Sequence, residues 1–564
     1  MASITDKKTI FFVTSPRSPD KLINEIRTLV ENFEGEKWNE KTQKDFYLHL
    51  SKQDFFKGST TGDLAFKARD RINRAPKALG FVDLSPVIKL TNAGKLFLTG
   101  KRSEEVFLRQ LIKFQLHSPY HTDKNDAFRV KPYLELMRLV YELGGLSKHE
   151  IGLFVIGLTS YKKYDDVKSR ILDFRKEKSG LRKRKVSYKQ FIAEEFEKEL
   201  SRLFAEKIKG GEIFIRQNKK QSLGKFIRAK KSNHLDYSDA SIRYLRMTGL
   251  FSMNPRSSKV YVLEERKKDV EFILENTPRD IFKYKNEDDY KTQLFAATEP
   301  KLFVDDKERI ISKILRKSNE FNTGELEIKT TEELKDIYKS ILQKSLTELV
   351  ENEQSKLKDY EDFDDVDEVF SSITNREAVD PSLFFEWNVW RAFSMLDDGD
   401  IQGNFKVDDD GVPLYTAPAN TPDIVCKYKD FDTIVEVTLS SGQKQYEMEG
   451  EPVARHYGNY RKETQKDVVF GIFIAPKLND AAVAHYYALY RINIEHYGGK
   501  AKIIPLSLDD LKTLLKNAYQ SKKRPKAADI KTLFVHLSDL ALSTSSEKEW
   551  RQKISETVQG AFIQ

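Results

Sequence analysis

Two acidic residues close together in the sequence are the first candidates for chemistry. Residues 421–442, "TPDIVCKYKDFDTIVEVTLSSG", contain two short β-type runs. Asp423 opens the first run, after a proline, and Glu436 lies near the end of the second. Carboxylates brought together on paired strands can bind a divalent metal ion, and such an ion assists the hydrolysis of phosphate esters. Whether the two acids can act together therefore depends on how the two strands pair.

The spacing of these runs predicts an antiparallel hairpin with a tight turn at Lys429 and Asp430. Asp423 then lies directly across from Glu436, with the two Cβ atoms about 4.5–5.5 Å apart. Two carboxylates so placed repel each other, and a bound divalent cation such as Mg²⁺ reverses the sign of that interaction. A solvated acidic pair is the alternative, but the apolar flanking residues favour the metal site. The same register pairs Val425 with Ile434 and Lys427 with Asp432.

Two further carboxylates and a histidine have places near this hairpin. Glu386 lies between Phe385 and Trp387 in an aromatic-rich helical stretch, where a buried charge needs a partner or a metal. Glu449 lies near the start of the helical segment that follows the hairpin. His456 follows on roughly the same helical face, and a lone histidine is more often structural, so we rank it only as an assistant.

The element order around the hairpin predicts an α/β domain over residues 376–564. A helix precedes the hairpin, another follows it, and the apolar run "DVVFGIFIAP" then reads as a buried central strand. This order, together with the Pro-Asp pair, is typical of the P-D…(D/E)-x-K core of restriction-type nucleases. Thr438 stands where that motif has lysine. The sequence up to this point leaves a nuclease, an inactive nuclease fold and an ordinary hairpin open.

Composition sets the outer limits. A chain of 564 residues is expected to form three or four domains. Its single cysteine, Cys426, excludes an intramolecular disulfide and a cysteine-cluster zinc site. We see no apolar run long enough to cross a bilayer and no signal-peptide pattern, so we expect a cytoplasmic protein with no membrane partner.

The net charge of +9 is unevenly distributed. Residues 161–190 and 206–232 are rich in lysine and arginine, whereas residues 351–380 are rich in aspartate and glutamate. Basic blocks of this kind favour a polyanion-binding half of the chain, with nucleic acid as the partner. Solvated helix faces are the alternative.

The N-terminal half reads as two small DNA-binding units, residues 1–135 and 136–285. Residues 64–100 show a basic helix ending near residue 79, two β runs joined by a turn at Ser85-Pro86, and a helix opening at Thr91. Residues 237–274 repeat this order, which is that of a winged helix. Ser147 and Glu150 between them form a predicted capping box.

Basic side chains on the first helix of each unit are candidates for contact with bases or phosphates in the major groove. A scaffold role on the surface is the alternative for each. The candidates are Arg69, Arg71, Arg74 and Lys77 in the first unit, and Arg243 and Arg246 in the second.

Residues 286–375 read as a helical connector that ends in an acidic tract. The helical periodicity of "TEELKDIYKSILQKSLTELVENEQSKLKDY" contains few breakers. The predicted fold class is therefore multidomain: a mainly helical recognition half, a helical connector and an α/β catalytic domain.

Several segments spread over most of the chain resemble the AlwI-type family of type IIS restriction endonucleases, which includes a strand-specific nicking enzyme. Together they are specific, although each alone is weak. They are "TSPRSP", "ARDRINRAPKALGF", "FEWNVWRAF", "PDIVCKY", "VEVTLSSG", "MEGEPVARHYG" and "KIIPLSLDDL".

The resemblance implies four catalytic carboxylates, Glu386, Asp423, Glu436 and Glu449. It also implies that E-V-T is the family's own pattern, so Thr438 does not by itself indicate an inactive site, and Thr438→Ala is expected to be mild. Asp423, Glu436 and the Val437 carbonyl are expected to hold one Mg²⁺, and Glu386 a second. Glu449 is expected to orient or deprotonate the attacking water, with Lys444 as the next candidate.

The activity implied is Mg²⁺-dependent cleavage of double-stranded DNA a few nucleotides outside the asymmetric site 5′-GAGTC. One core cuts one strand, so cleavage of both requires a second pass or a transient homodimer through the catalytic domains. The family further implies a bacterial host and a cognate DNA methyltransferase. The alternatives are a nicking enzyme, the large subunit of a heterodimeric endonuclease, and a non-catalytic DNA-binding regulator that kept the nuclease fold.

Overall fold

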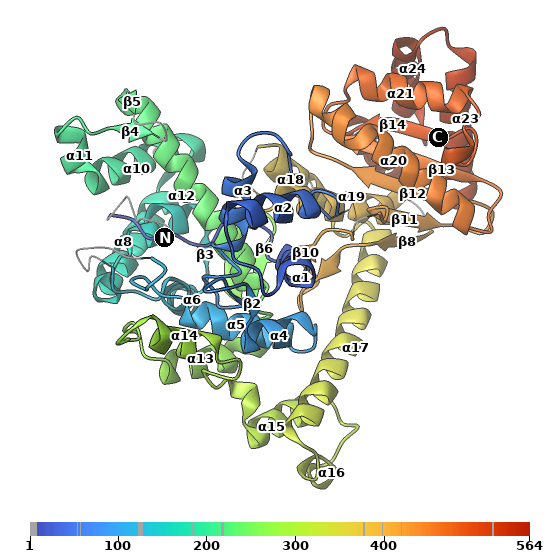
Figure 1. Cartoon of the computed structure of the whole chain (residues 1–564). Coiled ribbons are helices and arrows are strands. Elements are labelled where there is room, and N and C mark those ends of the chain that lie inside the picture. The colour runs from blue at the N-terminus through green and yellow to red at the C-terminus, as the bar shows by residue number, and fades with distance from the viewer. Residues whose placement is uncertain are drawn as a thin grey trace. The chain divides into compact units, whose positions relative to one another are not determined.

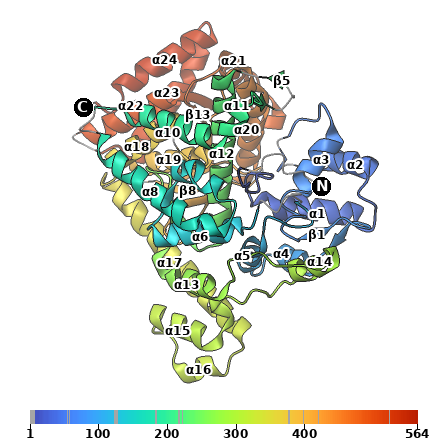
Figure 2. The same cartoon turned by 90° about the vertical axis from the view of Figure 1, so that its left-hand side faces the viewer.

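The computed structural model describes residues 8–53, 55–56, 58–121, 128–181, 185–215, 219–220, 222–375, 378–396, 399–418, 420–521 and 524–563. The chain is mostly helical, with one larger mixed sheet, and divides into two compact units (Figures 1 and 2). The first consists of Met1–Asn254 and Ser258–Leu342, and the second of Pro255–Ser257 and Gln343–Gln564. None of the described helices is both long and apolar enough to span a bilayer.

The first unit contains mostly helices and short strands. Its helices are α1 (Lys21–Phe33), α2 (Glu40–Leu50), α3 (Leu64–Ile72), α4 (Asn92–Leu98), α5 (Ser103–Lys113), α6 (Pro132–Glu142), α7 (Lys148–Leu153), α8 (Tyr164–Ser179), α10 (Tyr188–Leu203), α11 (Ala205–Lys209), α12 (Leu223–Arg246), α13 (Lys267–Asn276), α14 (Glu287–Phe295), α15 (Lys307–Lys317) and α16 (Thr323–Glu327). Its strands are β1 (Val82–Asp83), β2 (Lys89–Leu90), β3 (Leu146–Ser147), β4 (Phe214–Ile215), β5 (Lys219–Lys220), β6 (Phe251–Asn254) and β7 (Lys259–Val262).

The first predicted DNA-binding unit has its hairpin and second helix where expected. β1 pairs with β2, and Thr91 caps α4 by accepting a hydrogen bond from the Gly94 N–H. The first helix, however, ends at Ile72 and not near residue 79. Pro76 disfavours helical backbone at the preceding residue and has no N–H to donate, so the chain continues as turns up to Gly80.

The second predicted unit also shows the expected order of elements. α12 ends just before Gly249, which has a φ of 70°, and β6 and β7 then form an antiparallel hairpin before α13. β3 adds to this hairpin as a third strand. The capping box of Ser147 and Glu150 at the start of α7 is confirmed.

The predicted helical connector is divided by the boundary between the two units. Its central helix is confirmed as α17 (Thr331–Lys358), and the boundary falls between Leu342 and Gln343, inside this helix. The start of α17 packs with α15 and α16 through a small apolar cluster that includes Ile310, Ile314 and Leu334. The division of the chain into four domains stays a prediction.

The second unit surrounds the larger sheet. Its remaining helices are α18 (Phe363–Thr374), α19 (Pro381–Leu396), α20 (Gln443–Glu463), α21 (Asp480–Arg491), α22 (Leu508–Gln520), α23 (Ala527–Ser543) and α24 (Glu547–Gly560). Its strands are β8 (Asp400–Gly403), β9 (Lys406–Val407), β10 (Pro413–Tyr415), β11 (Ile424–Lys427), β12 (Asp432–Val437), β13 (Val469–Ala475) and β14 (Ile503–Ser507).

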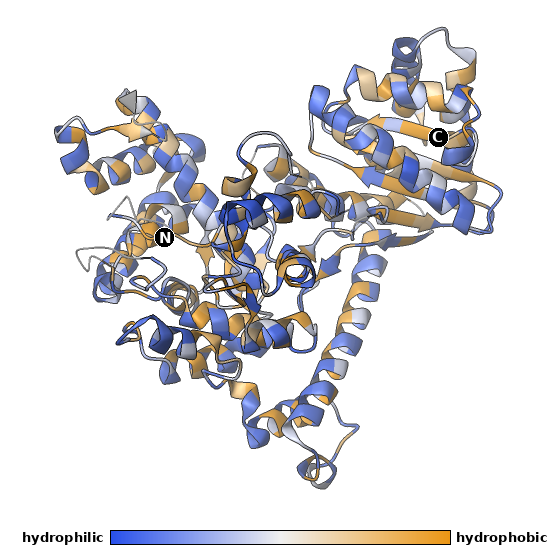
Figure 3. Ribbon diagram, viewed as in Figure 1, coloured by the Kyte–Doolittle hydropathy of each residue, from blue (hydrophilic) through white to orange (hydrophobic). Residues whose placement is uncertain are grey.

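The five strands of the larger sheet lie in the order β14-β13-β12-β11-β8. β12, β13 and β14 are parallel to one another, whereas β11 is antiparallel to both of its neighbours. β13 is buried at every residue, as the apolar run predicted, and the central strands are hydrophobic in Figure 3. α20 and α21 connect successive parallel strands and pack against each other, with α20 along β12 and β13 (Figure 1).

The predicted hairpin register is confirmed. Val425 pairs with Ile434, and Lys427 pairs with Asp432. The Tyr428 N–H donates to the Phe431 carbonyl oxygen at 3.1 Å, which closes the two-residue turn at the expected place. This hairpin and α20 carry most of the residues on which the candidate site depends.

One glycine sets how closely α20 can approach the chain that follows α21. A Cβ atom at Gly458 would lie 2.7 Å from the Cα and 2.9 Å from the carbonyl carbon of Tyr497, and both are backbone atoms. We therefore expect Gly458→Ala to destabilise the second unit by about 1–3 kcal/mol. Urea unfolding followed by tryptophan fluorescence measures this, since Trp387, Trp390 and Trp550 all lie in this unit.

Gly560 is the matched control, because a Cβ atom there meets nothing within 4 Å. It ends α24 in the same unit. Gly560→Ala should leave the urea midpoint unchanged or slightly raised. Equal urea midpoints for the two variants would show that the close approach of Gly458 to the Tyr497 backbone does not limit stability.

Candidate active site

Helix α20 runs antiparallel to β12, and side chains of alternate residues from Asp432 to Thr438, just after the end of β12, join the strand to the helix and to Thr464 directly after it. Alternate residues of a strand point to one face, so these side chains all face α20. The pairs are Thr438 with Glu449 at 2.8 Å, Glu436 with His456 at 2.7 Å, and Asp432 with both Tyr460 at 3.1 Å and Thr464 at 2.8 Å. Residues earlier in β12 pair with residues later in α20. These hydrogen bonds fix the register between the strand and the helix.

Asp423 reaches the same end of β12 from the neighbouring strand. Its Oδ2 accepts a hydrogen bond from the Val437 N–H at 2.8 Å. Its own carbonyl oxygen accepts one from the Asn404 N–H at 2.9 Å, which ties it to the chain after β8. The hairpin register continued by one pair sets Asp423 across from Glu436, so the two acids share the face that α20 covers.

Glu436 lies in a nearly closed environment. It is buried, and its Oε1 contacts Nδ1 of His456. Tyr486 of α21 is also buried, and burial, followed by the charges of Glu449 and Glu436, raises its pKa well above the usual range. The phenol therefore stays neutral, and its hydroxyl donates to the backbone carbonyl of Glu449 at 3.2 Å.

The first turn of α20 is fixed by a fully buried glutamine. Gln445 Nε2 donates to the carbonyl oxygens of Ser440 at 2.8 Å and Lys477 at 3.0 Å, and its Oε1 accepts the Asn479 N–H at 2.7 Å. These bonds hold together the chain after β12 and the chain after β13. Glu449 therefore projects from a backbone that is anchored one turn earlier. Nothing in the sequence around Gln445 singled it out.

The two remaining predicted residues of this region differ in exposure. Glu386 is buried on α19, as its aromatic neighbours indicated. Lys444 is exposed on the first turn of α20, next to the buried Gln445. Within the described ranges, no group of three or more His, Cys, Asp and Glu residues is arranged to hold a metal ion.

The first pair of DNA-contact candidates is engaged within the protein. Arg71 forms an ion pair with the buried Glu25, and its guanidinium lies 4.6 Å from the centre of the Phe56 ring. Burial raises the pKa of Glu25, and the Arg71 charge opposes that rise. Arg69 donates to Oε1 of Gln43 at 2.7 Å. These contacts support the scaffold alternative for both arginines.

Arg74 and Lys77 lie in the turns after α3. The Arg74 side chain is 46% exposed and pairs with Asp70 at 2.6 Å. Lys77 lies 4.4 Å from the centre of the Tyr120 ring, and burial lowers its pKa. Arg74 is thus the candidate of this unit that is best placed to reach a ligand.

The two candidates on α12 face inward. Arg243 donates to Oδ2 of Asp239 at 2.9 Å and to Oγ of Ser18 at 3.1 Å. Arg246 is buried. A base contact by either would require these side chains to rearrange. Their proposed role in binding DNA stays a prediction.

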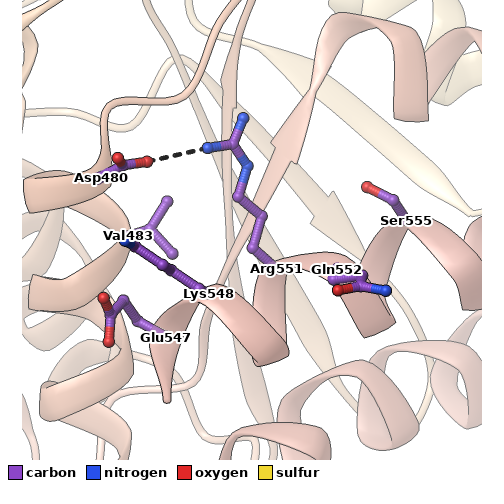
Figure 4. Close-up of a pocket in the computed structure, with 7 residues that line it drawn as sticks. All are labelled: Asp480, Val483, Glu547, Lys548, Arg551, Gln552 and Ser555. Atoms are coloured by element: carbon purple, nitrogen blue, oxygen red, sulfur yellow. Dashed lines mark hydrogen bonds and ion pairs between the residues drawn. The ribbon is translucent and has the colours of Figure 1, made fainter.

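A hollow of about 340 Å³ lies elsewhere in the second unit, between α21 and α24 (Figure 4). The Asp480 carboxylate and the Arg551 guanidinium pair across it at 3.1 Å. None of the predicted site residues lines it. It is therefore separate from Asp423 and Glu436 at the end of β12.

Comparisons with solved structures find restriction endonucleases. The small subunit of the heterodimeric restriction endonuclease R.BspD6I is 26% identical, covering 34% of this chain and 98% of that chain, with a TM-score of 0.30. The DNA-bound BpuJ1 endonuclease binding domain is 13% identical, covering 52% and 96%, with a TM-score of 0.32. Restriction endonuclease FokI is 10% identical, covering 91% and 93%, with a TM-score of 0.24.

The sequence, and not the likeness to these structures, identifies the family. A comparison with curated proteins finds no match. The family model described as AlwI restriction endonuclease matches residues 77–514, which is well over half of the chain and includes the hairpin, α20 and all four predicted carboxylates. The chain belongs to the AlwI restriction endonuclease family.

Proposed function

We propose that this restriction endonuclease is a type IIS enzyme that hydrolyses DNA a few nucleotides outside an asymmetric site. The observation that carries the proposal is the placement of Asp423 and Glu436 on one face at the end of β12, with Glu449 on the helix that covers that face. The family resemblance suggests 5′-GAGTC as the site. The second unit would be the P-D…(D/E)-x-K catalytic domain, and the winged-helix-like units of the first would read the sequence.

The donor groups at the end of β12 fit Mg²⁺. This ion prefers hard oxygen ligands and commonly uses one or two protein carboxylates together with water and phosphate, so a cluster of three acidic side chains is not required. Asp423, Glu436 and the Val437 carbonyl would hold the ion, and Glu386 would serve a second one directly or through water. The chemistry supplied there is polarisation of the scissile phosphate and a lowered pKa for a bound water.

The chain's own residues would then complete the hydrolysis. Glu449 would orient the attacking water and take its proton as the new P–O bond forms. The bond from phosphorus to the 3′ oxygen breaks, and that oxygen leaves as a hydroxyl after protonation from solvent, so the products are a 5′-phosphate and a 3′-hydroxyl. His456 would hold Glu436 in place. Lys444, being exposed, is a weaker candidate for the base.

The partners follow from this reaction. Double-stranded DNA is the substrate, and a transient homodimer through the catalytic domains would provide the second cut. A cognate methyltransferase in a bacterial cytoplasm would protect the host site. A nicking enzyme, or a large subunit that recruits a separate small subunit, differs only in how the second strand is cut. A regulator without catalysis is less favoured, because it has no evident need to gather like charges.

The first test removes the acids. Asp423→Asn and Glu436→Gln should each lower the cleavage of supercoiled plasmid with Mg²⁺ by at least about 10³-fold, because each removes a charge from the metal site. Specific binding of a GAGTC duplex should stay within about threefold of the wild type. EDTA should abolish cleavage by the wild type.

Asp430→Asn is the control, since Asp430 is exposed at the turn of the same hairpin. It should cleave normally. Normal cleavage by Asp423→Asn or Glu436→Gln would show that the metal site does not lie on this face. Open-circular product that never becomes linear would indicate the nicking alternative.

The second test separates a DNA contact from a scaffold arginine. Arg74→Ala should lower DNA affinity and leave stability unchanged, because an exposed ion pair contributes little. A base contact would relax one position by about 1–3 kcal/mol, whereas a phosphate contact would weaken all sequences evenly and reduce the salt slope by about one. Arg71→Ala should instead destabilise the fold by up to about 3 kcal/mol, because Glu25 would stay buried without its cation.

Binding titrations at several salt concentrations and urea unfolding measure the two effects. If Arg74→Ala binds as tightly as the wild type at every salt concentration, Arg74 belongs to the scaffold as well.

A further inference from the structure

We propose that Thr438 is the positioning residue for Glu449, and that its uncharged hydroxyl takes the place of the lysine that the nuclease motif has at this position. The inference rests on the proposed function, since it gives Glu449 a role in hydrolysis. It also revises the sequence-based expectation that the Thr438 hydroxyl has no role, because that hydroxyl lies 2.8 Å from Oε1 of Glu449.

The direction of this hydrogen bond follows from the neighbours of the hydroxyl. Thr438 Oγ1 accepts a hydrogen bond from the Ser440 N–H at 3.1 Å. A hydroxyl has a single proton, and a carboxylate oxygen is the natural acceptor for it. With Ser440 donating to the oxygen, the Thr438 proton is directed to Glu449. A hydrogen bond to a charged acceptor is stronger than a neutral one.

The Thr438 side chain has little freedom to move. Thr438 is only 7% exposed, and its N–H donates to the Ile474 carbonyl oxygen of β13 at 2.9 Å. Its β-branched side chain has few accessible rotamers. The Glu449 backbone is fixed in turn by the Tyr486 hydroxyl and, one turn earlier, by Gln445. The remaining freedom is that of the Glu449 side chain, which the Thr438 bond restrains at one oxygen.

A lysine at this position would act differently. Its long side chain would bring a cation among Glu436, Glu449 and Asp423, where it would compete with the metal ion. Threonine restrains the acid without adding charge. The arrangement therefore keeps the negative potential that binds the metal and lets Glu449 act as the base.

Single-turnover cleavage of a short GAGTC duplex at saturating enzyme and Mg²⁺ tests the role. Thr438→Val keeps the shape but removes the donor, so the cleavage rate should fall about 10- to 100-fold. Duplex binding without metal should stay within about twofold, since Thr438 does not touch the substrate in this scheme. Thr438→Ser keeps the donor and should retain a rate within about threefold of the wild type.

Thr433→Val is the matched control. Thr433 lies on the opposite face of the same strand, is fully buried, and its hydroxyl has no hydrogen-bond partner among the described residues. This variant should cleave at the wild-type rate. If urea unfolding shows that Thr438→Val does not fold, Thr438→Ala replaces it in the cleavage, binding and double-mutant measurements.

A double-mutant cycle separates positioning from a general structural effect. Glu449→Asp keeps a carboxylate but withdraws it from Thr438, so adding Thr438→Val to it should cost less than about twofold more. If Thr438→Val lowers the cleavage rate of Glu449→Asp by the full 10- to 100-fold, the proposal is wrong. It is also wrong if Thr438→Val cleaves at the wild-type rate, or if Thr438→Ser loses as much rate as Thr438→Val. A wild type that does not cleave would count against the proposed function, whereas a cleaving wild type with an unaffected Thr438→Val counts against Thr438 alone.

Discussion

The attachment of α20 to β12 is the constraint on which the candidate site depends. β12 is a central strand of the larger sheet, so its position is fixed by hydrogen bonds on both edges. Side-chain hydrogen bonds from alternate strand residues then set where α20 lies along it. A slip of one residue in the strand would turn Glu436 and Thr438 away from the helix, because alternate side chains point to opposite faces. The acids therefore depend on the register of the whole sheet.

This attachment also explains how several carboxylates are held in a largely enclosed place. Burying a charge is costly unless it is hydrogen-bonded, and each acid on this face has a specific donor. Asp423 is held by a backbone N–H, Glu436 by His456 and Glu449 by Thr438. Each of these donors stabilises a carboxylate without a lysine or arginine. The face therefore keeps a net negative character, which suits a divalent cation better than an internal salt bridge would.

In the first unit, basic side chains that the sequence offered as DNA contacts instead take part in the protein's own packing. Basic residues there are numerous, yet Arg71 is paired with a buried glutamate and Arg246 is itself buried. An arginine on a helix that looks basic in sequence can thus be part of the core. A buried acid such as Glu25 cannot be recognised from the sequence, since its burial depends on helices distant along the chain. Arg74 is the remaining candidate for contact with DNA because its side chain is exposed as well as charged.

The sequence by itself determined the local features: the hairpin register, the buried strand β13, the capping box at Ser147, the central connector helix and the family. The structural features among these follow from interactions between residues near in sequence or from a strong apolar pattern, and the family follows from the match of residues 77–514. The helix predicted to reach residue 79 ended at Ile72, because the effect of Pro76 outweighed helical periodicity. Only the tertiary structure decided which side chains meet. The roles of Tyr486 and the Thr438 hydroxyl come from contacts with α20, and that of Gln445 from contacts of α20 with the chain after β12 and after β13. Such contacts leave no periodic signal in the sequence.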